Sequence, residues 1–151
     1  MDHAPTGAHS VCWLFVHLVW SPHRRSAVLT PDWETRADRA IRAKALQLRC
    51  EVLAYAASGD HVHVLVRYDA TISIADLVQG LKGVSSHALN ASGPFRWQRG
   101  YFAESVHRRD LDPLRDYIER QRTRHEHSQP SCWRIDEGLT NAEPPSSPAR
   151  P

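Results

Sequence analysis

The sequence is short of cysteine, with three in 151 residues and no Cys-x-x-Cys pair among them. A disulfide framework or a cysteine-ligated zinc site is therefore not expected. Long apolar runs are also missing, since none approaches the ~20 residues that a transmembrane helix needs. The first residues lack the charged and then apolar pattern of a signal peptide. These absences predict a soluble, cytoplasmic protein with no membrane partner.

Lysine is scarce as well, with Lys44 and Lys82 as the only two, and the formal net charge is only +2. Such a charge does not by itself indicate a nucleic-acid-binding protein. The arginines nevertheless gather locally, at 24–25, at 108–109 and along 120–124. Clustered cations attract phosphate groups, but a preference for arginine over lysine can also reflect genome composition. Charge alone leaves both interpretations open.

The two ends of the chain are poor in residues that could form a core. Residues 1–10 are polar and interrupted by Pro5 and Gly7, which predicts a flexible arm. Residues 135–151 are rich in proline and serine, a composition that does not bury a core and predicts a disordered tail. The expected folded domain is therefore 11–134.

Apolar and β-forming residues predict four strands. The first is a dense run of β-formers at 13–20, and the others lie at 51–57, 61–68 and 101–106. The turn residues Ser58-Gly59-Asp60 join the second and third strands into a hairpin.

Three helices are predicted from their capping residues and apolar stripes. Thr30-Pro31 begins the first, a capping box from Ser73 to Asp76 begins the second, and Asp112-Pro113 caps the last. The resulting order is βαββαβ and one more helix. This order predicts an α+β, ferredoxin-like fold, with an antiparallel sheet, helices on one face and a C-terminal helix.

Two histidines stand at the start of the third predicted strand, in the segment Asp60-His61-Val62-His63. Alternate side chains of a strand point to the same face, so His61 and His63 would project together, opposite the valines. Two imidazoles on one face can supply two ligands to a metal ion, although ordinary strand histidines are the simpler interpretation. A histidine-triad nucleotide hydrolase would need a third histidine where this chain has Leu65.

Tyr117 and Gln121 are four residues apart on the last predicted helix, so they share a face. One interpretation is a half-buried aromatic beside a solvated glutamine. Another is catalytic: a tyrosine hydroxyl can attack phosphorus when a cation polarises the phosphate, and an amide oxygen of Gln121 could bind that cation. The pair alone does not decide between them.

Four segments together resemble a known family. They are His61-Val62-His63 after Gly59-Asp60, and the stretches 79–86, 97–101 and 117–121. In this order and spacing they are similar to the IS200-like transposases, which are single-tyrosine HUH endonucleases and include the REP-associated tyrosine transposases. The resemblance runs from about Phe15 to His127.

The resemblance implies a role for each motif. His61, His63 and Gln121 would be ligands of Mg²⁺ or Mn²⁺, and Tyr117 would be the nucleophile that cuts single-stranded DNA. Cleavage would leave a 5′-phosphotyrosine link and a free 3′-hydroxyl. The resemblance further implies a homodimer that recognises hairpins in single-stranded DNA, located in the cytoplasm with the nucleoid. Imidazole and amide ligands are softer than Mg²⁺ prefers, which predicts tighter binding of Mn²⁺.

Further residues are candidates for DNA contacts, by charge, by hydrogen bonding or by stacking on unpaired bases. They are Arg24, Arg25, Lys82, Ser85, Ser86, Trp97, Arg120 and Arg124. A solvated helix face explains 82–86 equally well, and core packing is expected for at least one of Trp97, Tyr101 and Phe102. The family often carries a Thr-Lys pair after the first strand, where this chain has Ser21-Pro22.

Two alternatives remain beside a transposase. One is a domesticated relative that binds hairpin DNA or RNA without cutting it. The other is a metal-dependent phosphohydrolase of small nucleotides, which would leave Tyr117 and Gln121 unexplained.

Overall fold

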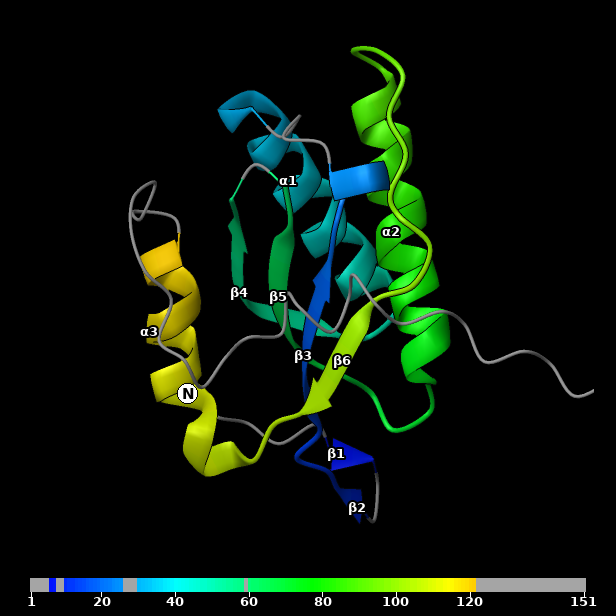
Figure 1. Cartoon of the computed structure of the whole chain (residues 1–151). Helices are drawn as coiled ribbons and strands as arrows, with labels where there is room; N and C mark the ends of the chain where they lie inside the picture. Colours follow the sequence, from blue (N-terminus) through cyan, green and yellow to red (C-terminus); the bar gives the residue numbers. More distant parts are fainter. Residues whose placement is uncertain (1–5, 8–9, 26–29, 59, 122–151) are drawn as a thin grey trace, which may run out of the picture.

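A computed structural model describes residues 6–7, 10–25, 30–58 and 60–121. Its centre is a four-stranded antiparallel sheet with the strand order β4-β5-β3-β6 (Figure 1). The strands are β3 (Phe15–Trp20), β4 (Glu51–Ala57), β5 (Val62–Arg67) and β6 (Phe102–Ser105). The first strand in this βαββαβ order lies beside the third, as a ferredoxin-like sheet requires, so the predicted fold class is confirmed.

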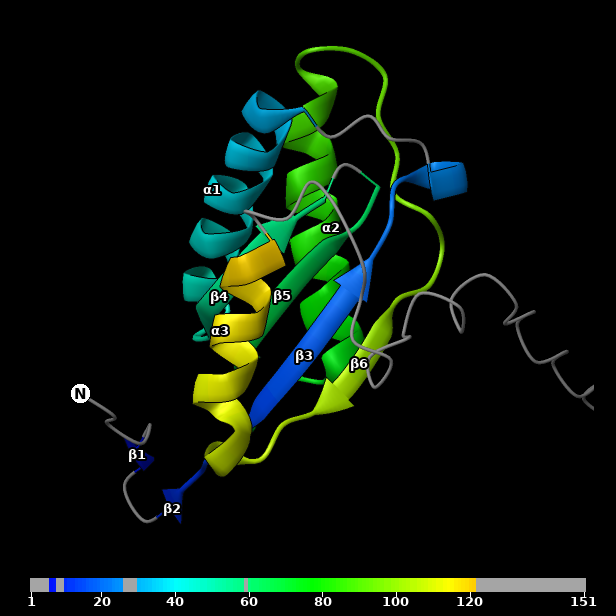
Figure 2. The same cartoon turned by 60° about the vertical axis from the view of Figure 1, so that its left-hand side comes forward.

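The helices lie on both sides of this sheet. Helices α1 (Pro31–Gln47) and α2 (Ile74–Asn90) cover one face, and α3 (Leu111–Gln121) packs on the other (Figure 2). The predicted caps of the first two helices are confirmed: the Thr30 hydroxyl accepts from the Trp33 N–H, and the Ser73 hydroxyl accepts from the Asp76 N–H. Within the described residues, no helix is long and apolar enough to span a membrane.

Side chains alternate along β5 as predicted. Val62, Val64 and Val66 belong to the larger apolar core, between the sheet and α1 and α2. Leu65 points the other way and packs with residues of α3. Fully burying a valine stabilises a fold by about 1.5–3 kcal/mol, so the valines determine which face of β5 turns to the core. His61 and His63 are thereby directed to the face that carries α3.

The start of the last helix differs from the prediction. A 3₁₀ turn, η2 (Arg108–Asp110), comes directly before α3, and the His107 side chain caps it by accepting from the Arg109 N–H at 3.1 Å. Asp112 and Pro113 therefore lie in the first turn of α3 and do not cap it, because the chain is already helical before them.

Three short elements near the N-terminus are also absent from the sequence prediction. β1 (Thr6–Gly7) pairs with β2 (Ser10–Val11) in a small antiparallel ladder that begins in the predicted arm and ends at the first residue of the predicted domain. A second 3₁₀ turn, η1 (His23–Arg25), follows β3, and Arg24 adopts a positive φ of 58° there.

Candidate active site

Two histidines from neighbouring strands are paired on the α3 face of the sheet. His17 on β3 and His63 on β5 stack with 5.3 Å between ring centroids and 14° between ring planes. The Nε2 of His17 lies 3.0 Å from the Nδ1 of His63, and both side chains are buried. His17 is the one residue of this group that sequence reasoning missed. Its only sequence sign is a polar side chain in the middle of an otherwise apolar strand.

His61 is held by its own turn, just before β5. Its Nδ1–H donates to Asp60 Oδ1 at 2.7 Å, and Ser58 Oγ lies 2.9 Å and 3.1 Å from the two ring nitrogens. The rings of His61 and His63 are 4.9 Å apart and inclined by 72°. The structure therefore brings the two predicted histidines together, each with a separate partner that restrains its ring.

Tyr117 reaches the same place from α3. Its ring meets His63 edge-on, with 6.1 Å between centroids and 86° between planes. The helix is held on the sheet by Leu114 and Ile118, which pack on Ala54 and Ala56 of β4. Gln121, one turn after Tyr117, ends the helix and is partly buried. Because the apolar side of α3 packs on the sheet, Tyr117 lies next to His63.

Burial controls the charge of the paired histidines. It lowers the pKa of His17 from an ordinary 6.5 to about 4. Burial is also the main reason that the pKa of His63 lies well below 6.5, and repulsion from His61 and His17 lowers it further. A buried imidazole loses solvation when it is protonated. Both rings are therefore neutral at pH 7, the form that can donate a lone pair to a cation.

The comparison with protein families decides which group this chain belongs to. A family model described as IS200-like transposase matches residues 10–121, which is most of the chain. The chain belongs to the IS200-like transposase family. His61, His63, Tyr117 and Gln121 all lie inside the matched range. No curated protein matches the chain significantly.

Solved structures similar to this IS200-like transposase include two transposases. One, described as a candidate transposase from Deinococcus radiodurans R1, has 26% identity and a TM-score of 0.63, and the match covers 77% of this chain and 96% of that one. The other is a REP-associated tyrosine transposase bound to a REP hairpin, with 16% identity, a TM-score of 0.59, and coverage of 90% and 87% respectively. At that identity the second likeness shows the fold alone.

The donor chemistry of the transposase site fits a divalent cation. His61 and His63 offer imidazole nitrogens side by side. Within the part of the chain that the structure describes, no three His, Cys, Asp or Glu side chains are arranged to hold a metal. Among the described residues, a third protein ligand would therefore be of another type, and the amide oxygen of Gln121 is such a group. His17 is unsuited to ligate, because its Nε2 faces His63 and its Nδ1 is buried.

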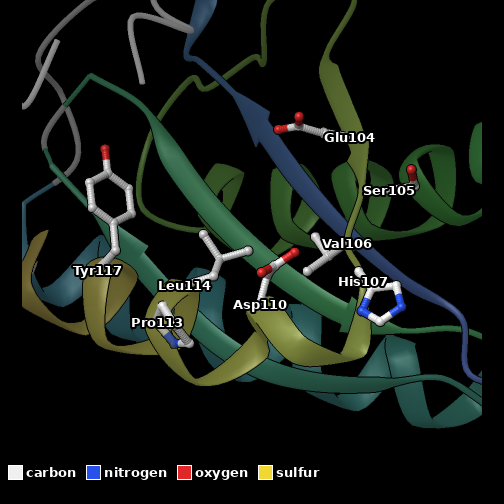
Figure 3. A pocket seen from close by; sticks show the side chains of 8 residues that line it. All are labelled: Glu104, Ser105, Val106, His107, Asp110, Pro113, Leu114 and Tyr117. Carbon is white, nitrogen blue, oxygen red and sulfur yellow. The ribbon is translucent and has the colours of Figure 1, made fainter. Parts of the chain in front are cut away.

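A pocket of about 270 Å³ opens beside Tyr117 (Figure 3). It is formed where the end of β6 leads through η2 into α3, and its lining is Glu104, Ser105, Val106, His107, Asp110, Pro113, Leu114 and Tyr117. The sequence contains no motif that would identify it, because its shape depends on how the chain turns between strand and helix. Tyr117 is one of its lining residues, so the cavity adjoins the candidate nucleophile.

Three candidates for DNA contact make hydrogen bonds within the protein. Ser85 and Trp97 are buried on the opposite face of the sheet, where the Trp97 Nε1–H donates to Ser85 Oγ at 2.9 Å. Both are therefore out of reach of a DNA strand in this structure, and the expected core packing is confirmed for Trp97. Lys82 Nζ donates to the carbonyls of Gln98 and Gly100, at 2.6 Å and 2.8 Å. Burial lowers the pKa of Lys82.

The remaining candidates lie nearer the surface. Arg120 is exposed on α3, and Arg24 is exposed in η1, where its backbone N–H donates to Gln98 Oε1. Arg25 belongs to the same turn. Ser86, partly buried, accepts from Asn90 Nδ2 through its carbonyl at 2.8 Å. Arg124 lies outside the described residues.

Proposed function

We propose that this transposase is a metal-dependent endonuclease and strand transferase that cuts single-stranded DNA with Tyr117. The observation that carries the proposal is the edge-on contact of the Tyr117 ring with His63, beside His61. That arrangement puts the Tyr117 side chain on the same face of the sheet as the imidazoles of His61 and His63. A nucleophile next to a cation site is the combination that phosphodiester cleavage requires.

In the proposed reaction the Tyr117 hydroxyl attacks the scissile phosphorus. The bond from phosphorus to the 3′-oxygen breaks, a bond from phosphorus to the tyrosine oxygen forms, and the phenol proton leaves to solvent while the 3′-oxygen takes one up. A divalent ion on His61, His63 and Gln121 would stabilise the negative charge that develops on the phosphate. The 5′-phosphotyrosine link preserves the phosphodiester energy, so a 3′-hydroxyl of another strand can reverse the step.

Hairpin-containing DNA is the proposed substrate, and a homodimer is the proposed assembly. The REP-associated tyrosine transposase that shares this fold is bound to a REP hairpin, which supports a hairpin as the first substrate to try. Exposed arginines such as Arg120 supply the cationic surface that a DNA backbone needs.

The test is a covalent adduct. The protein is incubated with Mn²⁺ and labelled single-stranded hairpin DNA, then separated under denaturing conditions. Wild type should give a protein–DNA adduct, and Tyr117→Phe should give none. Tyr68→Phe is the matched control, because Tyr68 packs against the apolar core on the other face of the sheet.

An equal yield of adduct from wild type and Tyr117→Phe would overturn the assignment of the nucleophile. An adduct that forms unchanged in His63→Ala would overturn the metal site. Tight hairpin binding by a wild-type protein that forms no adduct would instead favour the non-cleaving binding protein.

A further inference from the structure

His17 is a polar side chain in a strand whose six residues are all buried. Burying a polar group is costly unless it is hydrogen-bonded. Only one ring nitrogen of His17 has a partner: its Nε2 faces the Nδ1 of His63 at 3.0 Å, while its Nδ1 has no hydrogen-bond partner among the described residues. An apolar side chain would avoid this cost, so the stability of the fold does not explain His17.

Only one hydrogen atom can lie between the two facing nitrogens, and this leaves two neutral arrangements. In one, His17 Nε2–H donates to His63 Nδ1, and His63 carries its own hydrogen on Nε2. In the other, His63 Nδ1–H donates to His17 Nε2, and His63 Nε2 has a free lone pair. The second arrangement puts the hydrogen of His17 on its buried, unpartnered Nδ1.

Only the second arrangement prepares His63 to bind a cation through Nε2. A histidine that ligates a metal commonly donates its other N–H to a neighbouring acceptor, which fixes both the tautomer and the direction of the ring. For His61 that acceptor is the carboxylate of Asp60, at 2.7 Å. For His63 the group in the equivalent position is the imidazole of His17.

We propose that His17 is a positioning residue for the cation site: it accepts from His63 Nδ1–H and so presents His63 Nε2 to the ion. This role rests on the proposed function, since it requires His63 to be a ligand. Stacking of the two rings, 14° from parallel, holds the acceptor in line. Phe102 packs edge-on against His17 from β6, at 6.2 Å, and restrains it from the other side.

Three substitutions separate this role from simple packing. His17→Phe keeps a ring and removes the acceptor. His17→Gln places an amide oxygen near the former Nε2, whereas His17→Asn places one near the former Nδ1. Affinity for Mn²⁺ is measured by electron paramagnetic resonance of the free ion, and the thermal midpoint is measured without metal.

We expect His17→Phe to weaken Mn²⁺ binding by about 10–100-fold, the usual effect of losing a partner of a ligand. His17→Gln should recover most of the affinity and His17→Asn should not, while the metal-free thermal midpoints remain close to wild type. In ¹⁵N spectra with saturating Mg²⁺, His63 should carry its hydrogen on Nδ1 in wild type.

His63→Ala distinguishes the two levels of inference. If His63→Ala loses Mn²⁺ binding and His17→Phe binds as wild type does, the role of His17 is wrong and the proposed metal site stands. If His63→Ala binds Mn²⁺ normally, the metal site itself is wrong and the role of His17 fails with it. Equal rescue by Gln and Asn, or a hydrogen on His63 Nε2 in the Mg²⁺ complex, would also overturn the proposal.

Discussion

The two faces of the sheet differ in composition, although alternating residues of the same strands form both. The face under α1 and α2 is broad and apolar, and it includes aromatic contacts such as Trp20 with Trp97. The face under α3 has a small core of alanine, leucine and isoleucine side chains beside three buried histidines. One face holds the fold together, and the other positions chemically reactive groups on a rigid support. Because side chains alternate with a period of two, a single strand serves both purposes.

The strongest test of this division compares adjacent residues of β5 that face opposite ways. His63→Ala should weaken Mn²⁺ binding by more than about 100-fold and should remove the DNA adduct. Loss of a residue that only hydrogen-bonds to a ligand already lowers metal affinity by about 10–100-fold, and loss of the ligand itself should cost more. Val64→Ala should leave both intact and lower the free energy of unfolding by about 2 kcal/mol. Metal titration and chemical denaturation of the two variants provide the measurements. A large stability loss in His63→Ala would mean that the faces are not separable.

The next effect concerns pH. The unfolded chain protonates His17 near 6.5, whereas the folded chain resists protonation until about 4, so the unfolded state binds more protons between these values. The contribution of His17 to the free energy of unfolding should therefore be complete above pH 6.5. It should fall by about 3 kcal/mol as the pH drops to 4. His63 contributes in the same direction.

Denaturation in EDTA across this pH range measures the loss. His17→Phe should flatten the curve, because the unfolded-state proton uptake at this position disappears. A wild-type curve as flat as that of His17→Phe would show that burial does not hold His17 neutral.

On the other face, Ser85→Ala tests whether a predicted DNA contact is a core contact. The substitution leaves the Trp97 Nε1–H without its acceptor, which should lower the free energy of unfolding by about 1–3 kcal/mol. Hairpin affinity should not change, as measured by a shift assay at a temperature where the variant is folded. Gln79→Ala, at an exposed position of the same helix, is the control for general effects on α2.

The smallest effect is expected for a surface arginine. Arg120→Gln should weaken hairpin binding modestly and should reduce the slope of log affinity against log salt by about 0.7, the value for one phosphate contact on a single strand. Filter binding at several salt concentrations measures the slope. Arg42→Gln on α1, on the opposite side of the sheet, should leave it unchanged.

Local features of this fold were predictable from the sequence, and non-local ones were not. The caps at Thr30 and Ser73 depend on residues within one turn, and the alternation at His61 and His63 depends only on strand geometry. The pairing of His17 with His63 spans 46 positions and depends on the register of β3 against β5. No pattern within either strand reveals that register.

The same limit explains why residues predicted to contact DNA make hydrogen bonds inside the protein. A helical stripe shows which residues share a face, but not whether that face meets solvent or a returning loop. Lys82 and Ser85 meet the segment around Trp97, which folds back over α2. The pocket beside Tyr117 is similarly a product of chain direction after β6 and carries no motif of its own.

The alanines at 54 and 56 on β4 have a consequence beyond packing. Leu114 and Ile118 of α3 pack against these two alanines. The small size of the two methyl groups therefore determines how closely α3 approaches the sheet. Larger side chains at these two positions would push α3 away from the sheet, and the Tyr117 hydroxyl would move with the helix. If Tyr117 is the nucleophile, as proposed, its reactivity would therefore depend on the size of two buried residues on another strand.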